Sequence, residues 1–264
     1  MKRKALLSSG LLVVLALAAT PAHAQIDPGT VNENHYKVYE LLPPVPPLTT
    51  GPFGLRDQFG FTDHETAMLE KFGIPAEKHL QDATGEVFPI LDPFRHYTWW
   101  EFDFTEPFVR RVDVLDQFGG HSWRLRTSRY LLAPAGKNQA DVPEGNHYKC
   151  YEADDAPIVN IAVGLVDQVD SVGVFVLHGE YFCNPADKTV GGVTYSMVDS
   201  TAHLTCYRVE NTTPYDVTDV AVDQFGNRPI VLQQNTYLCV PAVKETVVGT
   251  ESTTWGRIKS LYQR

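Results

Sequence analysis

The chain has 264 residues, of which 32 are Asp or Glu and 22 are Lys or Arg, so its formal net charge is −10. Such an acidic chain repels nucleic acid and anionic membrane surfaces, which excludes binding to either as its main role. With 43% hydrophobic and 11% aromatic residues it has ample material for a core, which excludes a disordered protein.

The N-terminus predicts a secretory signal peptide over residues 1–24. A basic start (residues 1–4) precedes an apolar run (residues 5–19), and an Ala-x-Ala cleavage site ends at Ala24. The apolar run is too short for a membrane anchor, and no second long apolar stretch follows it. We therefore expect a secreted or periplasmic protein without a membrane span after cleavage.

The remaining chain carries a frame of residues that recurs at nearly constant spacing. A His lies 20 residues before an Asp, and a Pro and a Lys lie 18 and 21 residues after it, except that His35 lies 22 residues before its Asp. A fixed period indicates repeated structural units. We number four units by their His, Asp and Lys: His35, Asp57 and Lys78; His96, Asp116 and Lys137; His147, Asp167 and Lys188; and His203, Asp223 and Lys244.

Each unit predicts about three short strands: around the His, before the Asp, and between the Asp and a Cys-Pro segment. The sequence Asp-Gln-Phe-Gly after the second strand is typical of a tight turn, with Gly at the position of positive φ. In unit three this Gly is replaced by Asp170, a residue type that tolerates left-handed geometry.

Unit one differs from the others in two ways. Its Pro-rich segment at residues 41–47 predicts an extended connector, because Pro suits neither helix nor central strand. Residues 62–71 predict a short helix, since Thr62 and Glu65 fit a capping box. A zinc-protease motif at His64 is rejected, because the position four residues later is Met68 instead of a second His.

Seven aromatic residues lie between Phe94 and Phe108 in unit two. We favour a buried strand with large side chains. The alternative is a platform on which sugar rings stack, with Trp100, Tyr97 and Phe102 as candidate ligand-binding residues. Trp100 occupies the frame position that Tyr39, Tyr151 and Tyr207 hold in the other units.

The expected fold is all-β. Three strands cannot bury two faces alone, so the four repeats of approximately 45 residues should pair into two β-sandwich or small-barrel domains. The predicted organisation is a signal peptide (1–24), an N-terminal segment (25–33), repeat pair one without Cys but with the helix (34–138), repeat pair two (139–245) and a C-terminal tail (246–264).

The four cysteines follow the frame. Cys150 and Cys183 lie 33 residues apart, as do Cys206 and Cys239. In the other two units both positions are occupied by other residues, so each unit has either both cysteines or neither. This correlation selects disulfides within units three and four from the three possible pairings. The positions equivalent to the cysteines are Val38 and Gly73 in unit one, and Trp99 and Leu132 in unit two.

A His and an Asp in each unit are possible metal ligands, with His35, His96, His147 and His203 as weak candidates. We favour the interpretation that each His starts a strand and each Asp caps a turn, because no second ligand cluster accompanies them. No nucleophile elbow, phosphate loop or dinucleotide fingerprint occurs, so we expect neither a metal nor a cofactor.

The segments His147–Tyr151 and His203–Tyr207, the Asp-Gln-Phe-Gly turns, and the sequences that begin at Cys183 and Cys239 resemble an uncharacterised repeat domain of exported bacterial proteins. The resemblance is clearest over residues 147–244. It implies export and a repeated architecture, and no catalytic residues.

We therefore expect an exported, non-catalytic structural or binding module, at the cell surface or in the periplasm, with a protein or a glycan as its partner. The alternative is an exported hydrolase or carbohydrate-active protein with a site at the domain interface.

Overall fold

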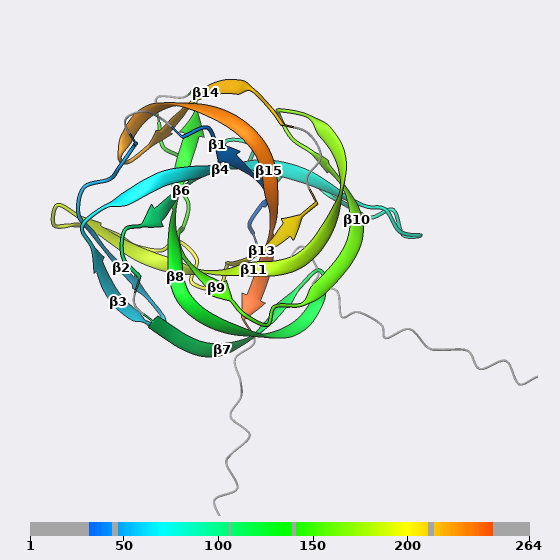
Figure 1. Ribbon diagram of the computed structural model, residues 1–264, viewed down its shortest axis with the longest axis horizontal. Helices are drawn as coiled ribbons and strands as arrows, with labels where there is room; N and C mark the ends of the chain where they lie inside the picture. Colours follow the sequence, from blue (N-terminus) through cyan, green and yellow to red (C-terminus); the bar gives the residue numbers. More distant parts are fainter. Residues whose placement is uncertain (1–31, 44–46, 106, 139–140, 211–213, 245–264) are drawn as a thin grey trace, which may run out of the picture.

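The computed structural model describes residues 32–43, 47–105, 107–138, 141–210 and 214–244. The signal peptide, nearly all of the N-terminal segment and the C-terminal tail lie outside these residues. All regular structure in the described residues is β, which confirms the predicted class (Figure 1). The strands are β1 (His35–Leu41), β2 (Phe53–Asp57), β3 (Gly60–His64), β4 (Ala67–Leu80), β5 (Val87–Phe88), β6 (His96–Phe102), β7 (Pro107–Asp116), β8 (Gly119–Lys137), β9 (His147–Ala153), β10 (Ile158–Val166), β11 (Ser171–Val190), β12 (Val193–Tyr195), β13 (His203–Val209), β14 (Val217–Asp223) and β15 (Gly226–Lys244).

Eight of these strands pair in a closed cycle. In order they are β1, β4, β6, β8, β9, β11, β13 and β15, and β15 pairs with β1 again; every pairing is antiparallel. Figure 1 looks along the axis of this ring. Each unit supplies the strand that begins at its His and the long strand that ends near its Lys.

The expectation of two separate β-sandwich or small-barrel domains is wrong, since all fifteen strands belong to one sheet. The first strand of each unit pairs with the long strand of its own unit and also with that of the preceding unit. The pairings β8–β9 and β15–β1 therefore join the two expected halves as firmly as β4–β6 and β11–β13 join units within them.

Side chains inside the ring form a core of tyrosines, cysteines and aliphatic residues. The rings of Trp99 on β6 and Tyr237 on β15 stack 6.4 Å apart, although these strands are not neighbours in the ring. Contact between non-neighbouring strands places this cluster in the interior. Two further clusters cover the outer face of the ring strands.

The four Asp turns close hairpins that extend the sheet beyond the ring. Asp57 pairs with Gly60, Asp116 with Gly119 and Asp223 with Gly226, and all three Gly have φ between 117° and 136°. The predicted glycine role is thus confirmed in these turns. In unit three the last pair in the strand register is Val166–Ser171, while the Asp167 N–H still donates to the Asp170 carbonyl at 3.0 Å. Asp170 does not have positive φ, so this turn needs no left-handed residue.

The predicted helix at residues 62–71 is wrong. This segment contains the end of β3 and the start of β4, and Ala67 and Leu69 are buried while Met68 between them is 41% exposed. Burial thus alternates with the two-residue period of a strand. Pairing with β6 along Ala67–Gly73 satisfies the backbone and overrides the local capping signal.

Candidate functional site

Each frame Asp fixes its own turn and also reaches a distant unit. One carboxylate oxygen, Oδ1, accepts the backbone N–H two residues further on, at 2.8–2.9 Å. The other oxygen accepts a hydrogen bond from the frame aromatic of the unit two places away. These bonds join Tyr151 to Asp57 (2.8 Å), Tyr207 to Asp116 (2.6 Å), Tyr39 to Asp167 (2.7 Å) and Trp100 Nε1 to Asp223 (3.1 Å).

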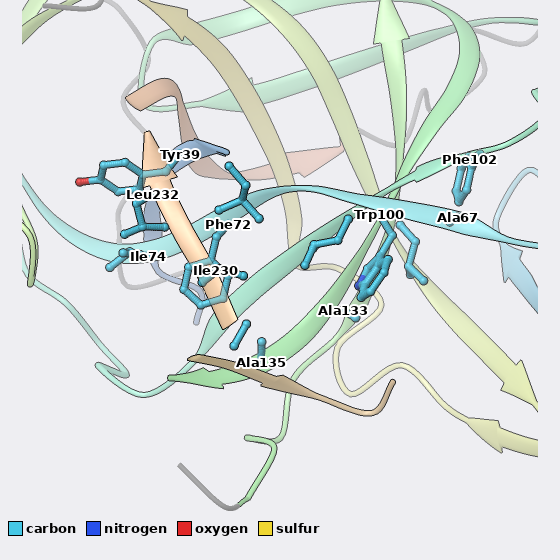
Figure 2. Close-up of a cluster of buried hydrophobic side chains, with 14 of the residues drawn as sticks. Tyr39, Ala67, Phe72, Ile74, Trp100, Phe102, Ala133, Ala135, Ile230 and Leu232 are labelled. Atoms are coloured by element: carbon cyan, nitrogen blue, oxygen red, sulfur yellow. The ribbon is translucent and has the colours of Figure 1, made fainter. Parts of the chain in front are cut away.

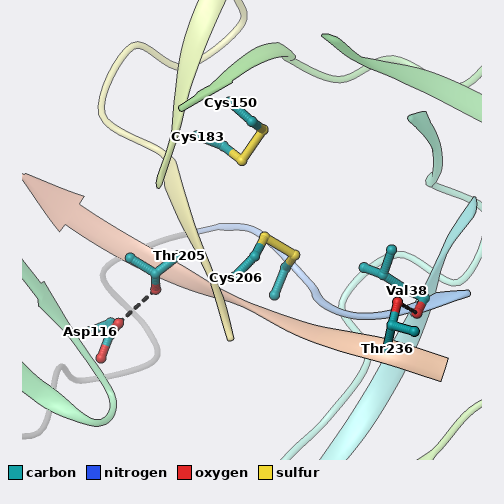
Figure 3. Close-up of a disulfide and its surroundings, with 8 residues drawn as sticks. Val38, Asp116, Cys150, Cys183, Thr205, Cys206 and Thr236 are labelled. Carbon is teal, nitrogen blue, oxygen red and sulfur yellow. Dashed lines mark hydrogen bonds between the residues drawn. A yellow bond between two sulfur atoms is a disulfide. The ribbon is translucent and has the colours of Figure 1, made fainter. Parts of the chain in front are cut away.

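The presence of both an Asp and an aromatic residue in every unit is therefore explained by the hydrogen bonds that join them across the molecule. Thr205 adds a second hydroxyl to the Asp116 carboxylate at 2.6 Å, and Thr98 adds one to Asp223 at the same distance (Figure 3 shows the Thr205 bond). Burial raises the pKa of Asp116 and of Asp223, while these hydrogen bonds act in the opposite direction.

The frame His of each unit contacts the turn Gln of the next unit, and the Lys of the same unit lies at that contact. We call each His–Lys–Gln group a clasp and name it by its His. The order is cyclic, because the Gln of unit one completes the clasp of unit four. The contacts are His35 with Gln117 (3.1 Å), His96 with Gln168 (3.4 Å), His147 with Gln224, and His203 with Gln58 (3.5 Å).

The clasps do not resemble metal sites. No group of three possible ligands that would hold a metal ion occurs in the part of the chain that the structure describes. Burial lowers the pKa of His35 and His147 to about 3 and that of His96 to about 4, and it also lowers the pKa of His203. The structure thus brings each neutral imidazole next to an amine and an amide instead of a second ligand.

In two clasps the lysine amine lies between aromatic rings. Lys78 Nζ lies 4.0 Å from the centre of the Phe88 ring and 5.2 Å from that of Phe118. Lys188 Nζ lies 5.6 Å from the Tyr195 ring and 4.0 Å from the Phe225 ring. Burial lowers the pKa of both lysines to about 7.

These two clasps differ in hydrogen bonding. Lys78 donates to Gln117 Oε1, which also contacts His35. Lys188 Nζ and Gln224 Oε1 are buried, and neither has a hydrogen-bond partner among the described residues, whereas the His35 clasp has one such atom, Gln117 Nε2. An unpaired buried polar group costs about 1–3 kcal/mol, so the His147 clasp is the less satisfied of the two.

The two clasps also differ in exposure. Phe88, which covers Lys78, is 3% exposed, whereas Tyr195, at the equivalent place over Lys188, is 43% exposed. A cavity of about 480 Å³ opens at the His147 clasp, within the range of small-molecule sites. It is lined by His147, Gln224 and Tyr195 together with Pro134, Val142, Pro143, Glu144, Gly145, Ser196 and Val198.

The aromatic residues predicted from the sequence lie elsewhere. Trp100 and Phe102 belong to an outer core cluster (Figure 2), and Tyr97 belongs to the interior of the ring. All three are at most 5% exposed. Their strand, β6, packs against the outer cluster on one face and against the interior cluster on the other, so both faces are covered. The structure brings none of these rings to a surface where a sugar could stack.

The predicted disulfides, Cys150–Cys183 and Cys206–Cys239, are both present (Figure 3). Each joins directly opposed residues of two ring strands. The equivalent pairs without cysteine, Val38–Gly73 and Trp99–Leu132, are opposed in the same way. A side chain placed on Gly73 would meet Trp99 Nε1 at 3.4 Å, so the large indole occupies the space that small Gly73 leaves.

Sequence reasoning missed the Gln of each clasp and the cavity. A signal for the Gln was present, because Gln58, Gln117, Gln168 and Gln224 follow all four Asp residues, whereas the Phe and Gly of the turn do not occur in unit three. The cavity had no local signal. Its lining comes from β8, β9 and β12, the Asp223 turn and two linkers that only the fold brings together.

A family model described as a repeat of unknown function (DUF7450) matches residues 96–241, which is more than half of the chain. No curated protein and no solved structure matches the chain.

Proposed function

Since the chain belongs to the family of repeats of unknown function (DUF7450), we propose from its own geometry that it is an exported, non-catalytic binding module whose ligand occupies the cavity at the His147 clasp. The observation that carries this proposal is the difference between equivalent clasps. The His35 clasp is covered by a buried Phe88, while the His147 clasp leaves two polar atoms unpaired beside a cavity.

The lining indicates the class of ligand. Pro134, Val142 and Val198 offer apolar contacts, while the free Gln224 Oε1 accepts a hydrogen bond. Small-molecule sites commonly combine a mainly apolar wall with a few polar groups that fix orientation. The expected ligand is a small molecule, or the tip of a partner's side chain, with an apolar body and one hydrogen-bond donor.

Export is supported by the N-terminal sequence and by the two disulfides, which persist in oxidising compartments. The intact mass of the protein secreted from a bacterial host tests this part. We expect a chain that begins at Gln25 and carries no free thiol. A product that keeps residues 1–24, or that stays in the cytosol with reduced cysteines, would contradict it.

Binding is tested with N-phenyl-1-naphthylamine, a neutral probe with an apolar body and one N–H that fluoresces in apolar surroundings. We expect saturable binding and at least a tenfold loss of affinity in Val198→Arg, because the charged side chain would enter the cavity. Leu91→Arg is the matched control. The Leu91 N–H donates to Asn34, next to His35, as the Val198 N–H donates to Asn146, next to His147. The two side chains are similarly exposed, 52% for Leu91 against 59% for Val198.

The control should bind the probe like the original protein. No saturable binding, or an equal loss of affinity in Val198→Arg and Leu91→Arg, would show that this cavity is not the site.

A further inference from the structure

Resting on the binding site proposed above, we propose that the ligand of the cavity at the His147 clasp is an organic cation, with an ammonium group on an apolar body. The charges of the cavity wall favour a cation over a neutral or an anionic molecule. Of the described residues that line the cavity, Glu144 alone is charged at neutral pH, because burial lowers the pKa of His147 to about 3.

A second, smaller cavity strengthens the negative character of this region. Three residues line both cavities: Glu144, Gly145 and Val198. The wall of the second cavity adds the acidic Glu33 and Asp199 and the basic Arg95. Arg95 forms an ion pair with Glu33 at 3.4 Å, which leaves the carboxylates of Glu144 and Asp199 in excess. An approaching ligand therefore meets a net negative wall.

The basic groups near Glu144 do not cancel its charge. Arg95 donates to the backbone carbonyl of Glu144 at 2.9 Å and not to its carboxylate. Lys188 Nζ lies 5.6 Å from the centre of the Tyr195 ring, and burial lowers the pKa of this lysine to about 7. At pH 8 Lys188 is therefore mostly neutral, while the carboxylates stay ionised and an alkyl amine ligand keeps its proton.

Two further groups of the lining suit an ammonium ion. Tyr195 is 43% exposed, and an aromatic ring attracts a cation. Gln224 Oε1 is a buried acceptor without a partner among the described residues, and an ammonium N–H can donate to it. The His35 clasp offers neither group, because its Phe88 is buried and its Gln117 Oε1 already accepts from Lys78.

The test compares three ligands that share a naphthalene body and differ in charge: 1-naphthylmethylamine, 1-naphthylmethanol and 1-naphthoate. Isothermal titration calorimetry on the full mature protein at pH 8 measures each dissociation constant. We expect the amine to bind about ten times more tightly than the alcohol, because an exposed ion pair and a cation–π contact together are worth about that factor. The carboxylate should bind more weakly than the alcohol.

A pair of variants separates contact with Glu144 from the net charge of the protein. Glu144→Gln should reduce the preference for the amine over the alcohol to about threefold or less, the part left by the aromatic contact. Asp141→Asn is the matched control, since this exposed carboxylate lies in the same linker and does not line the cavity. It should keep the full preference. An equal preference in the two variants would overturn the proposal.

Competition with N-phenyl-1-naphthylamine locates the amine. The amine should displace this probe, since both need the same cavity, and amine binding that leaves the probe in place would also overturn the proposal. Saturable probe binding with equal affinities for amine and alcohol refutes the cationic ligand alone and leaves a cavity for neutral molecules. No saturable binding of the probe or of any of the three ligands refutes the binding function itself.

Discussion

At the scale of single residues, the frame is a set of contacts between units. The Asp of one unit binds the aromatic of the opposite unit, and the Gln beside it binds the His of the preceding unit. Each Asp–Gln pair therefore joins three units at one turn. Such contacts demand a specific residue type at a specific distance along the chain, which explains why the spacing recurs.

The carboxylate of Asp116 provides a direct test of this interpretation. Asp116→Ala leaves the hydroxyls of Thr205 and Tyr207 and the Phe118 amide without their acceptor. We expect the free energy of unfolding to fall by about 3 kcal/mol, measured by urea denaturation. Asp103→Ala, at an exposed position, should change it by less than about 0.5 kcal/mol. Similar values for both variants would refute the structural role of Asp116.

The buried histidines predict a pH dependence of stability. The pKa of His35 and His147 is about 3 and that of His96 about 4, whereas an unfolded chain has His pKa values near 6.5. Below pH 6.5 the unfolded chain therefore takes up protons that the folded chain does not. Each of these His should lower the free energy of unfolding by up to about 2 kcal/mol between pH 7 and pH 5.

Urea denaturation at pH 7 and at pH 5 checks this prediction. His147→Gln should reduce the difference in the free energy of unfolding between pH 7 and pH 5 by the contribution of one histidine. His178→Gln, at an exposed position, is the control and should leave the difference unchanged. A difference that is as large in His147→Gln as in the original protein would show that His147 does not have a lowered pKa in the folded protein.

At the scale of the elements, each unit is a first strand, a hairpin and a long strand that serves both the hairpin and the ring. The disulfides join the first strand to the long strand within one unit, at the point where unit two has Trp99 opposite Leu132. Since apolar packing holds this position in unit two, a disulfide adds stability to a pairing that already forms without it.

Removal of one disulfide by Cys150→Ala with Cys183→Ala should therefore destabilise the protein and keep its fold. The 33-residue separation gives a loss of roughly 3.5–4 kcal/mol in the chain-entropy model. Urea denaturation measures the loss, and the circular dichroism spectrum should stay that of the original protein. A spectrum of an unfolded chain under native conditions would mean that the covalent link, and not the pairing, specifies this unit.

At the scale of the whole molecule, the ring closes only when both ends of the chain are present. Strand β1 pairs with β15, so residues near 36 contact residues near 239, and the Gln58 of unit one completes the clasp of unit four. No half of the chain contains a closed set of strands. We therefore expect the four units to unfold as one cooperative structure.

A chain limited to residues 145–245 should consequently fail to fold. It lacks β8 and β1, which pair with β9 and β15, and it lacks the partners of Asp167 and Asp223 at Tyr39 and Trp100. We expect no cooperative thermal transition by circular dichroism, in contrast to the mature full chain. A sigmoidal melt of the fragment would show that units three and four have a core of their own.

The sequence by itself determined the β class, the strand that begins at each His, the hairpin turns at the four Asp residues and both disulfides. These features depend on local chemistry or on a spacing that the repeat displays several times. Only the structure showed that the strands form a closed ring. Closure pairs the first strand with the last, and nothing in the sequence of either strand indicates which strand it pairs with.

The structure also decided the secondary structure of residues 62–71 and the location of the candidate site. A local capping signal could not reveal that β6 offers a continuous row of backbone partners to the segment from Ala67. Likewise, the His35 and His147 clasps share the same frame residues, and only the packing of Phe88 and Tyr195 over them leaves one closed and the other open.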